Sequence, residues 1–219
     1  DVSNNLNLVT LVCLDNQLSN LDLTYNPSLN YLRCENTNLS VLDLSNNINL
    51  TFLFCNSNTI NELDLSNNSS LIKIEIPNNN LDSLDLSMLS SLIEINCANN
   101  LLTYMDVRNG NNLIMSTFYT LNNPNLTCIN VDDTTYSNSN WTNIDPQSYF
   151  SINCNIINGC TDPLASNYDS LATSDDGSCV YAATFNVDMN CEPVGSFGYV
   201  HLESPLFGWC GGCVPMTDT

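Results

Sequence analysis

Two cysteines near the end of the sequence have the spacing used for thiol–disulfide exchange. The segment Trp209-Cys210-Gly211-Gly212-Cys213 matches the W-C-x-x-C pattern of redox-active dithiols. That chemistry needs the first cysteine at a helix N-terminus, after a strand, because the helix lowers the pKa of the thiol. No strand–helix–strand pattern precedes this segment, and Val214-Pro215 follows it directly. We therefore predict no redox catalysis by this cysteine pair.

Other catalytic residue sets are incomplete as well. His201 is the single histidine of the sequence, so a Ser/His/Asp triad has no support elsewhere in the chain. Asp132-Asp133 and Asp175-Asp176 are adjacent pairs, whereas the two carboxylates of a glycosidase must face each other across the substrate. The sequence therefore predicts a protein that is not an enzyme.

The composition excludes further classes of function. The 219 residues include 3 Lys+Arg and 23 Asp+Glu, which gives a formal net charge of −20. A surface that binds nucleic acid needs many basic side chains, so we expect no nucleic-acid partner. No apolar run approaches the roughly 20 residues of a membrane-spanning helix. Asparagine and leucine, with 39 and 31 residues, form about a third of the chain, a bias typical of repeat proteins.

The elements that must position any binding residues come from a 21-residue repeat. The triplet Leu-Asp-Leu recurs at 21–23, 42–44, 63–65 and 84–86, and becomes Met-Asp-Val at 105–107. Half a period away, a second apolar column consists of Cys13, Cys34, Cys55, Ile76, Cys97 and Phe118. Alternate residues of a strand point to one side, so each unit can form two short strands whose apolar side chains stack on those of the next unit. The pattern predicts a mainly β solenoid with short parallel strands on two sides over residues 1–127.

Each unit reads L-x-x-L-x-C-x-x-N-x-L-x-x-L-D-L-S-x-N-x-x, which contains the motif L-x-x-L-x-L-x-x-N twice. This pattern resembles leucine-rich repeats, specifically the nested irreko-type class, over about residues 5–133. The resemblance implies a leucine-rich-repeat solenoid in a secreted bacterial protein. Residues 128–158 lose the period and look like the disulfide-closed C-terminal cap of the same family, with Trp141 and Phe150 as structural plugs.

Four of the eleven cysteines lie within the repeats. Cys13, Cys34, Cys55 and Cys97 occupy an inward column in which other coils have Ile or Phe, and this predicts small buried side chains. A ladder of metal ligands is the alternative, although no histidine accompanies these cysteines.

The other seven cysteines follow the repeats, and such a cluster in loop-rich sequence indicates disulfides and an oxidising compartment. Proximity in the sequence predicts two pairs, Cys128–Cys154 and Cys160–Cys179. It leaves open whether Cys191 pairs with Cys210 or Cys213.

Two further segments follow the predicted cap. Residues 159–181 resemble a small Cys-bounded linker module of secreted bacterial proteins. Its aspartates could bind calcium, although their spacing is not that of an EF-hand and turn formation is the alternative. These aspartates are Asp162, Asp169, Asp175 and Asp176. Residues 182–219 resemble the start of a β-sandwich related to starch-binding domains, in which Trp209 could contact carbohydrate or pack in a core.

The two sides of the predicted solenoid differ in their outward residues. One side repeats aspartate at Asp22, Asp43, Asp64, Asp85 and Asp106. Like charges on neighbouring strands repel, so this column predicts an ionic face that salt or calcium stabilises, unless each carboxylate bonds within its own coil.

The other side varies from coil to coil and carries aromatic and basic side chains, which are favoured at protein interfaces. Its candidate partner-binding residues are Tyr31, Arg33, Phe52, Phe54, Lys73, Glu75, Glu94 and Asn96. Random drift of exposed positions is the alternative explanation of this variation. We name these eight residues the varied face.

These patterns predict a secreted or cell-surface module of a larger bacterial protein. It is expected to be monomeric, to need no cofactor, with calcium as the alternative, and to bind a protein or glycan through the varied face. The alternative is a non-catalytic accessory region of a secreted carbohydrate-active enzyme.

Overall fold

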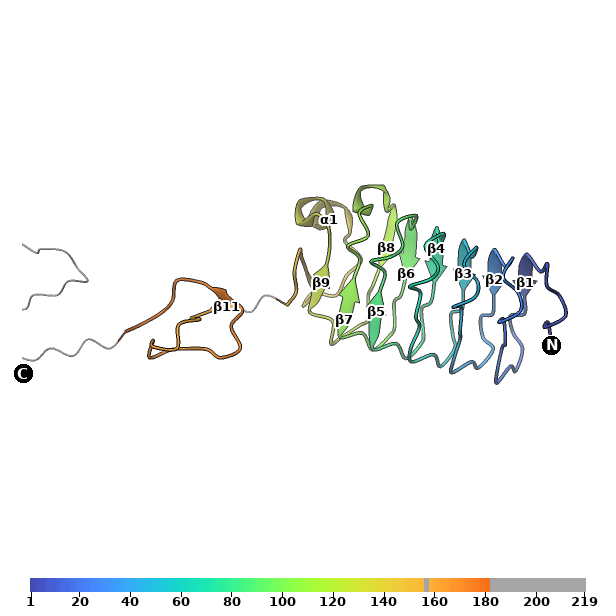
Figure 1. The fold of residues 1–219 in the computed structure, drawn as a ribbon, viewed down its shortest axis with the longest axis horizontal. Helices are drawn as coiled ribbons and strands as arrows, with labels where there is room; N and C mark the ends of the chain where they lie inside the picture. Colours follow the sequence, from blue (N-terminus) through green and yellow to red (C-terminus); the bar gives the residue numbers. More distant parts are fainter. Residues whose placement is uncertain (156–157, 182–219) are drawn as a thin grey trace, which may run out of the picture. The chain divides into compact units, whose positions relative to one another are not determined.

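The computed structural model describes residues 1–155 and 158–181, and the chain divides into two compact units at residue 155. The first unit is a solenoid in which short strands occupy the same place in successive coils (Figure 1). The predicted mainly β solenoid is therefore confirmed. The proposals for Cys191, His201, Trp209, Cys210 and Cys213 lie outside the described residues.

One side of the solenoid is a six-stranded parallel sheet in the order β1-β2-β3-β4-β6-β8. Its strands are β1 (Thr10–Val12), β2 (Tyr31–Arg33), β3 (Phe52–Phe54), β4 (Lys73–Glu75), β6 (Glu94–Asn96) and β8 (Thr117–Tyr119). Equivalent positions of the repeat lie opposite each other, as Leu32 does to Leu53 and Leu53 to Ile74. From β2 to β8 the middle residue of each strand is buried and its two neighbours face outward.

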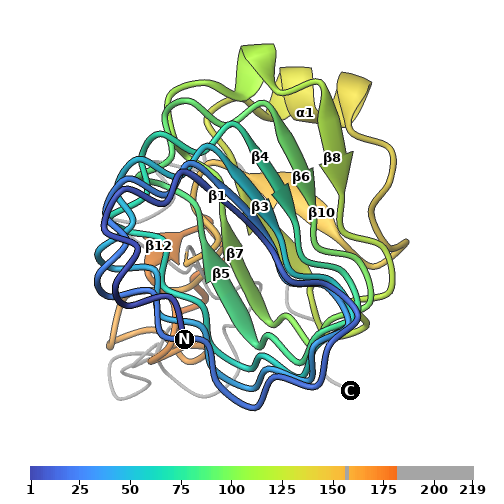
Figure 2. The ribbon, with the colours of Figure 1, turned by 90° about the vertical axis from the view of Figure 1, so that its right-hand side faces the viewer.

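The second side is a shorter sheet in the order β10-β9-β7-β5, seen beside the first sheet in Figure 2. Its strands are β5 (Ser83–Asp85), β7 (Tyr104–Asp106), β9 (Cys128–Asn130) and β10 (Tyr149–Ser151). The first three Leu-Asp-Leu triplets, at 21–23, 42–44 and 63–65, are not in strands. Their last leucines, Leu23, Leu44 and Leu65, are nevertheless each 1% exposed, because burial of a side chain does not require a backbone ladder. Two strands per unit thus form only in the C-terminal half.

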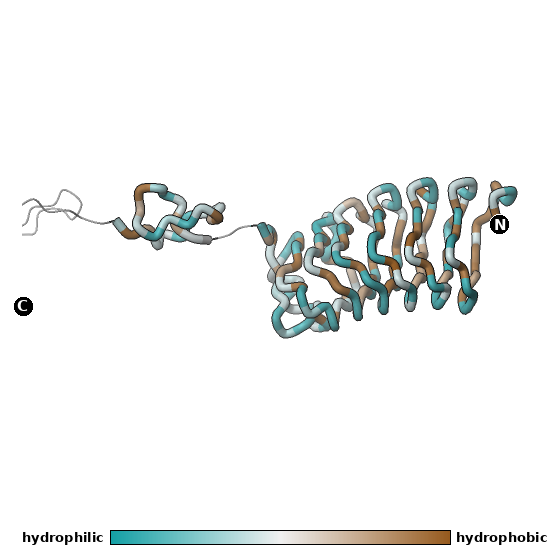
Figure 3. The backbone as a smooth tube through the Cα atoms, turned by 90° about the horizontal axis from the view of Figure 1, so that it is seen from below, coloured by the Kyte–Doolittle hydropathy of each residue, from teal (hydrophilic) through white to brown (hydrophobic). Residues whose placement is uncertain are grey.

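Leucine columns fill the space between the two sides, and asparagine side chains satisfy the backbone of the turns. Hydrophobic and hydrophilic segments alternate along every coil in Figure 3. Buried Asn79 donates from Nδ2 to the carbonyls of Cys55 and Ile76, at 3.0 and 3.1 Å, and its Oδ1 accepts from the Ile60 N–H. Asn58 and Asn100 make the same bonds one coil away on either side. These asparagines tie neighbouring coils together where the turns would otherwise bury unpaired groups.

Aromatic side chains close the C-terminal end of the solenoid. Asp133 caps helix α1 (Thr134–Asn140) by accepting hydrogen bonds from two N–H groups of its first turn. Trp141 follows the helix and stacks on Phe118 with ring centroids 4.3 Å apart, while Phe150 meets Trp141 edge-on at 5.7 Å. Trp141 and Phe150 are 3% and 7% exposed, which confirms their predicted role as plugs. A short 3-10 helix, η1 (Asn112–Ile114), lies in the last coils before the cap.

Two disulfides match the predicted pairing. Cys128–Cys154 closes the cap, and Cys160–Cys179 closes the second unit, which also contains β11 (Asn158–Gly159) and β12 (Ser174–Asp175). No helix among the described residues is both long enough and apolar enough to cross a lipid bilayer.

Candidate functional site

The six-stranded sheet places the varied face in two parallel columns. One column passes from Tyr31 through Phe52 and Lys73 to Glu94, and the other passes from Arg33 through Phe54 and Glu75 to Asn96. All eight side chains are partly exposed, as expected for outward positions of strands whose middle residues are buried. Strands lie about 4.8 Å apart, so residues from neighbouring coils form one continuous surface.

Three aromatic rings form the apolar centre of the varied face. The ring centroid of Tyr31 lies 5.9 Å from that of Phe52 and 5.5 Å from that of Phe54, in tilted arrangements. The guanidinium carbon of Arg33 lies 5.5 Å from the centroid of Phe54, and Nζ of Lys73 lies 6.0 Å from it. These distances are within the range of cation–π attraction, which helps to fix both cations at the rim of the aromatic cluster.

Both cations are also held by carboxylates. Arg33 donates from Nε and Nη2 to Oε1 of Glu35, at 2.9 and 2.6 Å, and this pairing raises the pKa of Arg33. Nζ of Lys73 donates to Oε2 of Glu94 at 2.7 Å and lies 3.3 Å from Oε1 of Glu75. The pKa of Lys73 is raised, mainly by its hydrogen bond with Glu94. The Arg33–Glu35 and Lys73–Glu75 ion pairs lie within one coil, whereas the Lys73–Glu94 pair connects two neighbouring coils across the sheet.

Three members of this surface were not predicted from the sequence. Glu35 lies two residues after Arg33, so the alternation of strand positions could have placed it on the same side. Its side chain is 10% exposed beneath the guanidinium. Thr117 and Tyr119 on β8 continue the two columns, opposite Glu94 and Asn96. The irregular spacing after Asn111 hides them from a 21-residue pattern.

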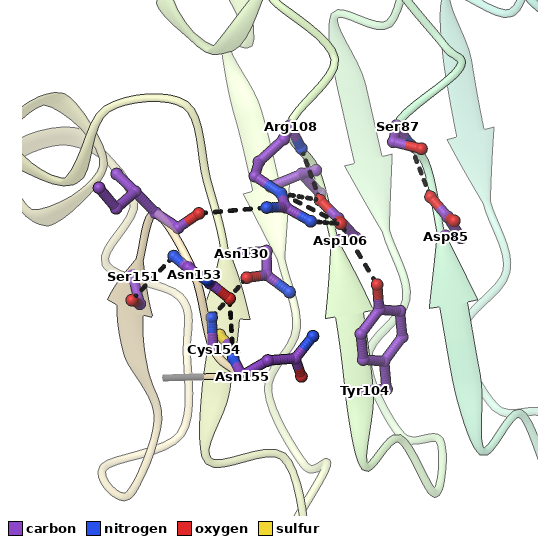
Figure 4. Close-up of polar contacts among 12 residues, drawn as sticks. Asp85, Ser87, Tyr104, Asp106, Arg108, Asn130, Ser151, Asn153, Cys154 and Asn155 are labelled. Atoms are coloured by element: carbon purple, nitrogen blue, oxygen red, sulfur yellow. Dashed lines mark hydrogen bonds and ion pairs between the residues drawn. The ribbon is translucent and has the colours of Figure 1, made fainter. Parts of the chain in front are cut away.

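The aspartate column on the other side makes local hydrogen bonds. The Oδ1 atoms of Asp22, Asp43, Asp64 and Asp85 accept hydrogen bonds from the N–H groups of Thr24, Ser45, Ser66 and Ser87, at 2.9–3.0 Å. Figure 4 shows the Asp85–Ser87 pair. Local hydrogen bonds lower the pKa of Asp22, Asp43 and Asp64. Asp43 acts in the opposite direction and raises the pKa of its neighbours Asp22 and Asp64, so some repulsion along the column remains.

Asp106, the fifth member of the column, is in a different environment. Its carboxylate is 4% exposed and is held by Arg108, which also donates from Nη1 to the carbonyl of Ile152 at 3.2 Å (Figure 4). The hydroxyl of Tyr104 donates to Oδ2 of Asp106 at 3.2 Å. Burial would raise the pKa of Asp106, but its hydrogen bonds and ion pair with Arg108 outweigh burial and lower it. The third basic residue of the chain thus ties the cap to the last coil, a role that the sequence analysis did not predict.

The inward cysteines are free thiols. Cys34, Cys55 and Cys97 are buried and Cys13 is half-buried in the first coil, as predicted for small inward side chains. The prediction that Phe118 continues this column is wrong, because Phe118 pairs with Ile95 and so lies in the neighbouring column of Leu53 and Ile74. Burial, with contributions from Cys34 and Glu35, raises the pKa of Cys13 to about 11. Burial raises the pKa of Cys97 to about 12.

A polar depression of about 720 Å³ lies at the turns that follow the first strands. It is lined by Asp15, Asn16, Gln17, Ser19, Asn36, Asn38, Ser57, Asn58 and Thr59. Asn36 and Asn38 adopt positive φ angles there, which asparagine tolerates better than most residues. The residues that line the depression are all polar, so the varied face remains the better candidate for protein recognition.

The residues that could hold a metal are engaged in turns. In the second unit Asp162 accepts hydrogen bonds from the Leu164 N–H and the Tyr181 hydroxyl, and Asp176 accepts from the Ser178 N–H. Within residues 1–155 and 158–181, no three His, Cys, Asp or Glu side chains gather as potential metal ligands. A role for calcium therefore stays a prediction.

Comparison with known proteins places the chain near two solved structures. It is similar to InlJ from Listeria monocytogenes, whose functional domain includes a cysteine ladder, with 24% identity over 68% of this chain and a TM-score of 0.29. It is also similar to internalin C2 from Listeria monocytogenes, with 19% identity over 68% of this chain and 74% of that chain, and a TM-score of 0.41. The match spans 44% of the solved InlJ chain. No family model matches the sequence, and no curated protein matches it either.

Proposed function

We propose that the solenoid is a non-catalytic recognition module that binds a protein partner through the varied face. The observation that carries this proposal is the cluster of Tyr31, Phe52 and Phe54, three partly exposed rings of which Tyr31 lies within 6 Å of both phenylalanines. Tyrosine and other aromatic residues are enriched at interfaces, and rings held in place by their neighbours lose little conformational entropy on binding.

The repeat architecture supports the same function. The inward residue of each strand is nearly constant from coil to coil. The two outward residues change along the axis, from Tyr and Arg on β2 to Phe and Phe on β3, Lys and Glu on β4, and Glu and Asn on β6. A solenoid can change such outward residues without loss of its core, so one scaffold can present a surface fitted to a particular partner.

The proposed location is the cell exterior. Cys128–Cys154 and Cys160–Cys179 support it, because such bonds persist in oxidising compartments. The alternative function, an accessory region of a carbohydrate-active enzyme, depends on residues 182–219, which lie outside the described part of the chain.

The test is alanine substitution in the aromatic cluster. An array of purified extracellular proteins is probed with the labelled full chain, and the strongest partner is titrated with Phe52→Ala and Phe54→Ala. Each substitution should weaken binding by about 2 kcal/mol, because large aromatic side chains at the centre of an interface dominate its energy. Thermal melting should change little, since both rings lie outside the core.

A matched control comes from the opposite side of the solenoid. Ser66→Ala removes an exposed side chain from the aspartate side and should leave both affinity and melting unchanged. If the Phe variants lose stability in proportion to affinity, the rings serve the fold and the proposal is wrong.

A further inference from the structure

We infer that the varied face selects a basic protein segment in which an apolar side chain and a Lys or Arg lie about three residues apart. This inference rests on the proposed function and adds the chemistry of the partner. It follows from how charges are distributed and used on the face.

The cations of the face are not available to an acidic partner. The surface that includes Glu35 holds two cations, Arg33 and Lys73, and three carboxylates, so its net charge is 2 − 3 = −1. Arg33 is committed to Glu35 through two hydrogen bonds, and Lys73 is shared between Glu75 and Glu94. An acidic ligand would have to displace a carboxylate from each cation before binding, which costs free energy.

The carboxylates of β4 and β6 remain open to a cationic ligand. The side chains of Glu75 and Glu94 are 26% and 36% exposed. Asn96 donates to Oε2 of Glu75 at 2.9 Å and so orients that carboxylate. Oε2 of Glu94 accepts a hydrogen bond from Nζ of Lys73. Two carboxylates that share one ammonium group form an acidic edge directly beside the aromatic cluster.

The spacing of the strands sets the spacing in the ligand. Glu75 lies one strand from Phe54, and Glu94 lies two strands from Phe52. At about 4.8 Å per strand, the distance from ring to carboxylate is about 5–10 Å. An extended chain advances about 3.3 Å per residue, so a ligand that crosses the strands would place its cation two to three residues from its apolar group.

The charge of the whole chain acts in the same direction. A formal charge of −20 attracts basic segments at long range and repels acidic ones, which raises the association rate of a basic partner at low salt. The charge of the whole chain cannot favour a particular spacing between the apolar side chain and the cation of the ligand. Only the positions of the rings and carboxylates on the varied face can do so.

The experiment begins with a random phage-displayed peptide library panned on the full chain. Enriched peptides should carry an aromatic or large aliphatic residue with Lys or Arg two or three positions away. The leading peptide is then synthesised, and its dissociation constant is measured by fluorescence anisotropy for the wild type and for variants whose melting is unchanged.

Two double variants with the same change in charge separate the site from the overall charge. Glu75→Gln with Glu94→Gln should weaken binding about fivefold, as expected for two partly exposed ion pairs. Asp43→Asn with Asp64→Asn, on the aspartate side, should change it by less than about twofold. Equal losses in both double variants would mean that net charge alone attracts the peptide, and the inference would be wrong.

The remaining outcomes separate this inference from the proposed function. Enrichment of acidic peptides that still depend on Phe54 would overturn the basic partner and keep the binding face. Peptides that are indifferent to Phe54→Ala would overturn both. Failure to enrich any sequence above the starting library would also count against the inference.

Discussion

At the scale of single residues, the same side chain serves different purposes in different columns. Cysteine in the inward column is a small apolar residue, because its sulfur lies among leucines and its thiol is not activated. A hydrogen bond with Cys55 and burial together raise the pKa of Cys34. Cysteine after the repeats forms disulfides instead. Position in the fold, rather than residue type, decides this chemistry.

The first prediction concerns the reactivity of the thiols. At pH 8, iodoacetamide should leave Cys34, Cys55 and Cys97 unlabelled in the native protein and should label Cys13 slowly. The reason is that burial excludes the reagent and the raised pKa values, about 11 for Cys13 and about 12 for Cys97, leave little thiolate. Mass spectrometry of the alkylated protein, with labelling in urea as the control, measures this. Detection of bridges among the four thiols would refute the buried column.

The second prediction concerns the pair formed by Asp106 and Arg108. Arg108→Ala should destabilise the solenoid by about 2–4 kcal/mol at pH 7, because it leaves a carboxylate buried without its cation. Since the pKa of Asp106 is below its usual 3.8 in the folded state, the pair stabilises the fold above that pH. This stabilisation is lost as the pH falls through the folded pKa.

Urea unfolding of the wild type and of Arg108→Ala between pH 2 and pH 7 tests this pair, and the difference should shrink below about pH 4. The double variant Asp106→Asn with Arg108→Ala is the control, and it should be more stable at pH 7 than Arg108→Ala alone. A difference that is constant with pH would show that Arg108 acts by packing.

At the scale of elements, the aspartate side illustrates how secondary structure changes an electrostatic argument. The expected repulsion between the aspartates assumes that they lie on neighbouring strands about 4.8 Å apart. Within the column, only Asp85 and Asp106 are paired in this way, and the charge of Asp106 is neutralised by Arg108. The triplets of Asp22, Asp43 and Asp64 are not in strands, and each carboxylate has a local N–H donor. The ionic face remains a proposal, now confined to these three residues and Asp85.

The third prediction tests this face by melting. Adding NaCl at constant pH should raise the melting temperature modestly, because salt screens the repulsion between Asp43 and its neighbours. An additional rise with CaCl2 at matched ionic strength would support bridging by calcium. Asp43→Asn, which can still accept the Ser45 N–H, should abolish part of the salt effect, whereas Ser45→Ala should not. A flat response to both salts would mean that the aspartates need no counter-ion.

At the scale of the whole molecule, the two compact units are closed separately. The cap joins the solenoid through aromatic packing and the Arg108 contact with Ile152, and Cys128–Cys154 closes the cap itself. The second unit contains its own disulfide and two two-residue strands. Residues 158–181, the described part of this unit, are too few to bury much apolar surface, so the disulfide should carry much of their order.

The fourth prediction follows from this division. Cys128→Ser with Cys154→Ser should destabilise the solenoid by about 3–4 kcal/mol, because the bond closes a loop between residues 26 positions apart. Cys160→Ser with Cys179→Ser should leave the melting of the solenoid unchanged. Circular dichroism melting of both double variants checks this. A comparable shift in both would contradict the independence of the two units.

The sequence by itself determined the period, the inward and outward positions of the regular coils and the two disulfide pairs. It could do so because a solenoid stacks residues that lie one repeat apart, so spacing along the chain translates directly into neighbours in space. The alternation of Tyr31, Leu32 and Arg33 was therefore enough to place two side chains outside and one inside.

Only the tertiary structure decided the contacts that break the repeat. Three contacts depend on side-chain rotamers and on segments from other coils. They are the Lys73–Glu94 ion pair, the Arg33–Glu35 ion pair and the hydrogen bond from Arg108 to Ile152 in the cap. The backbone ladder of the second side is likewise absent from the first three triplets, although their sequence is the most regular. A repeat fixes which residues are adjacent, but the hydrogen bonds and ion pairs between them depend on distances and orientations that the period does not contain.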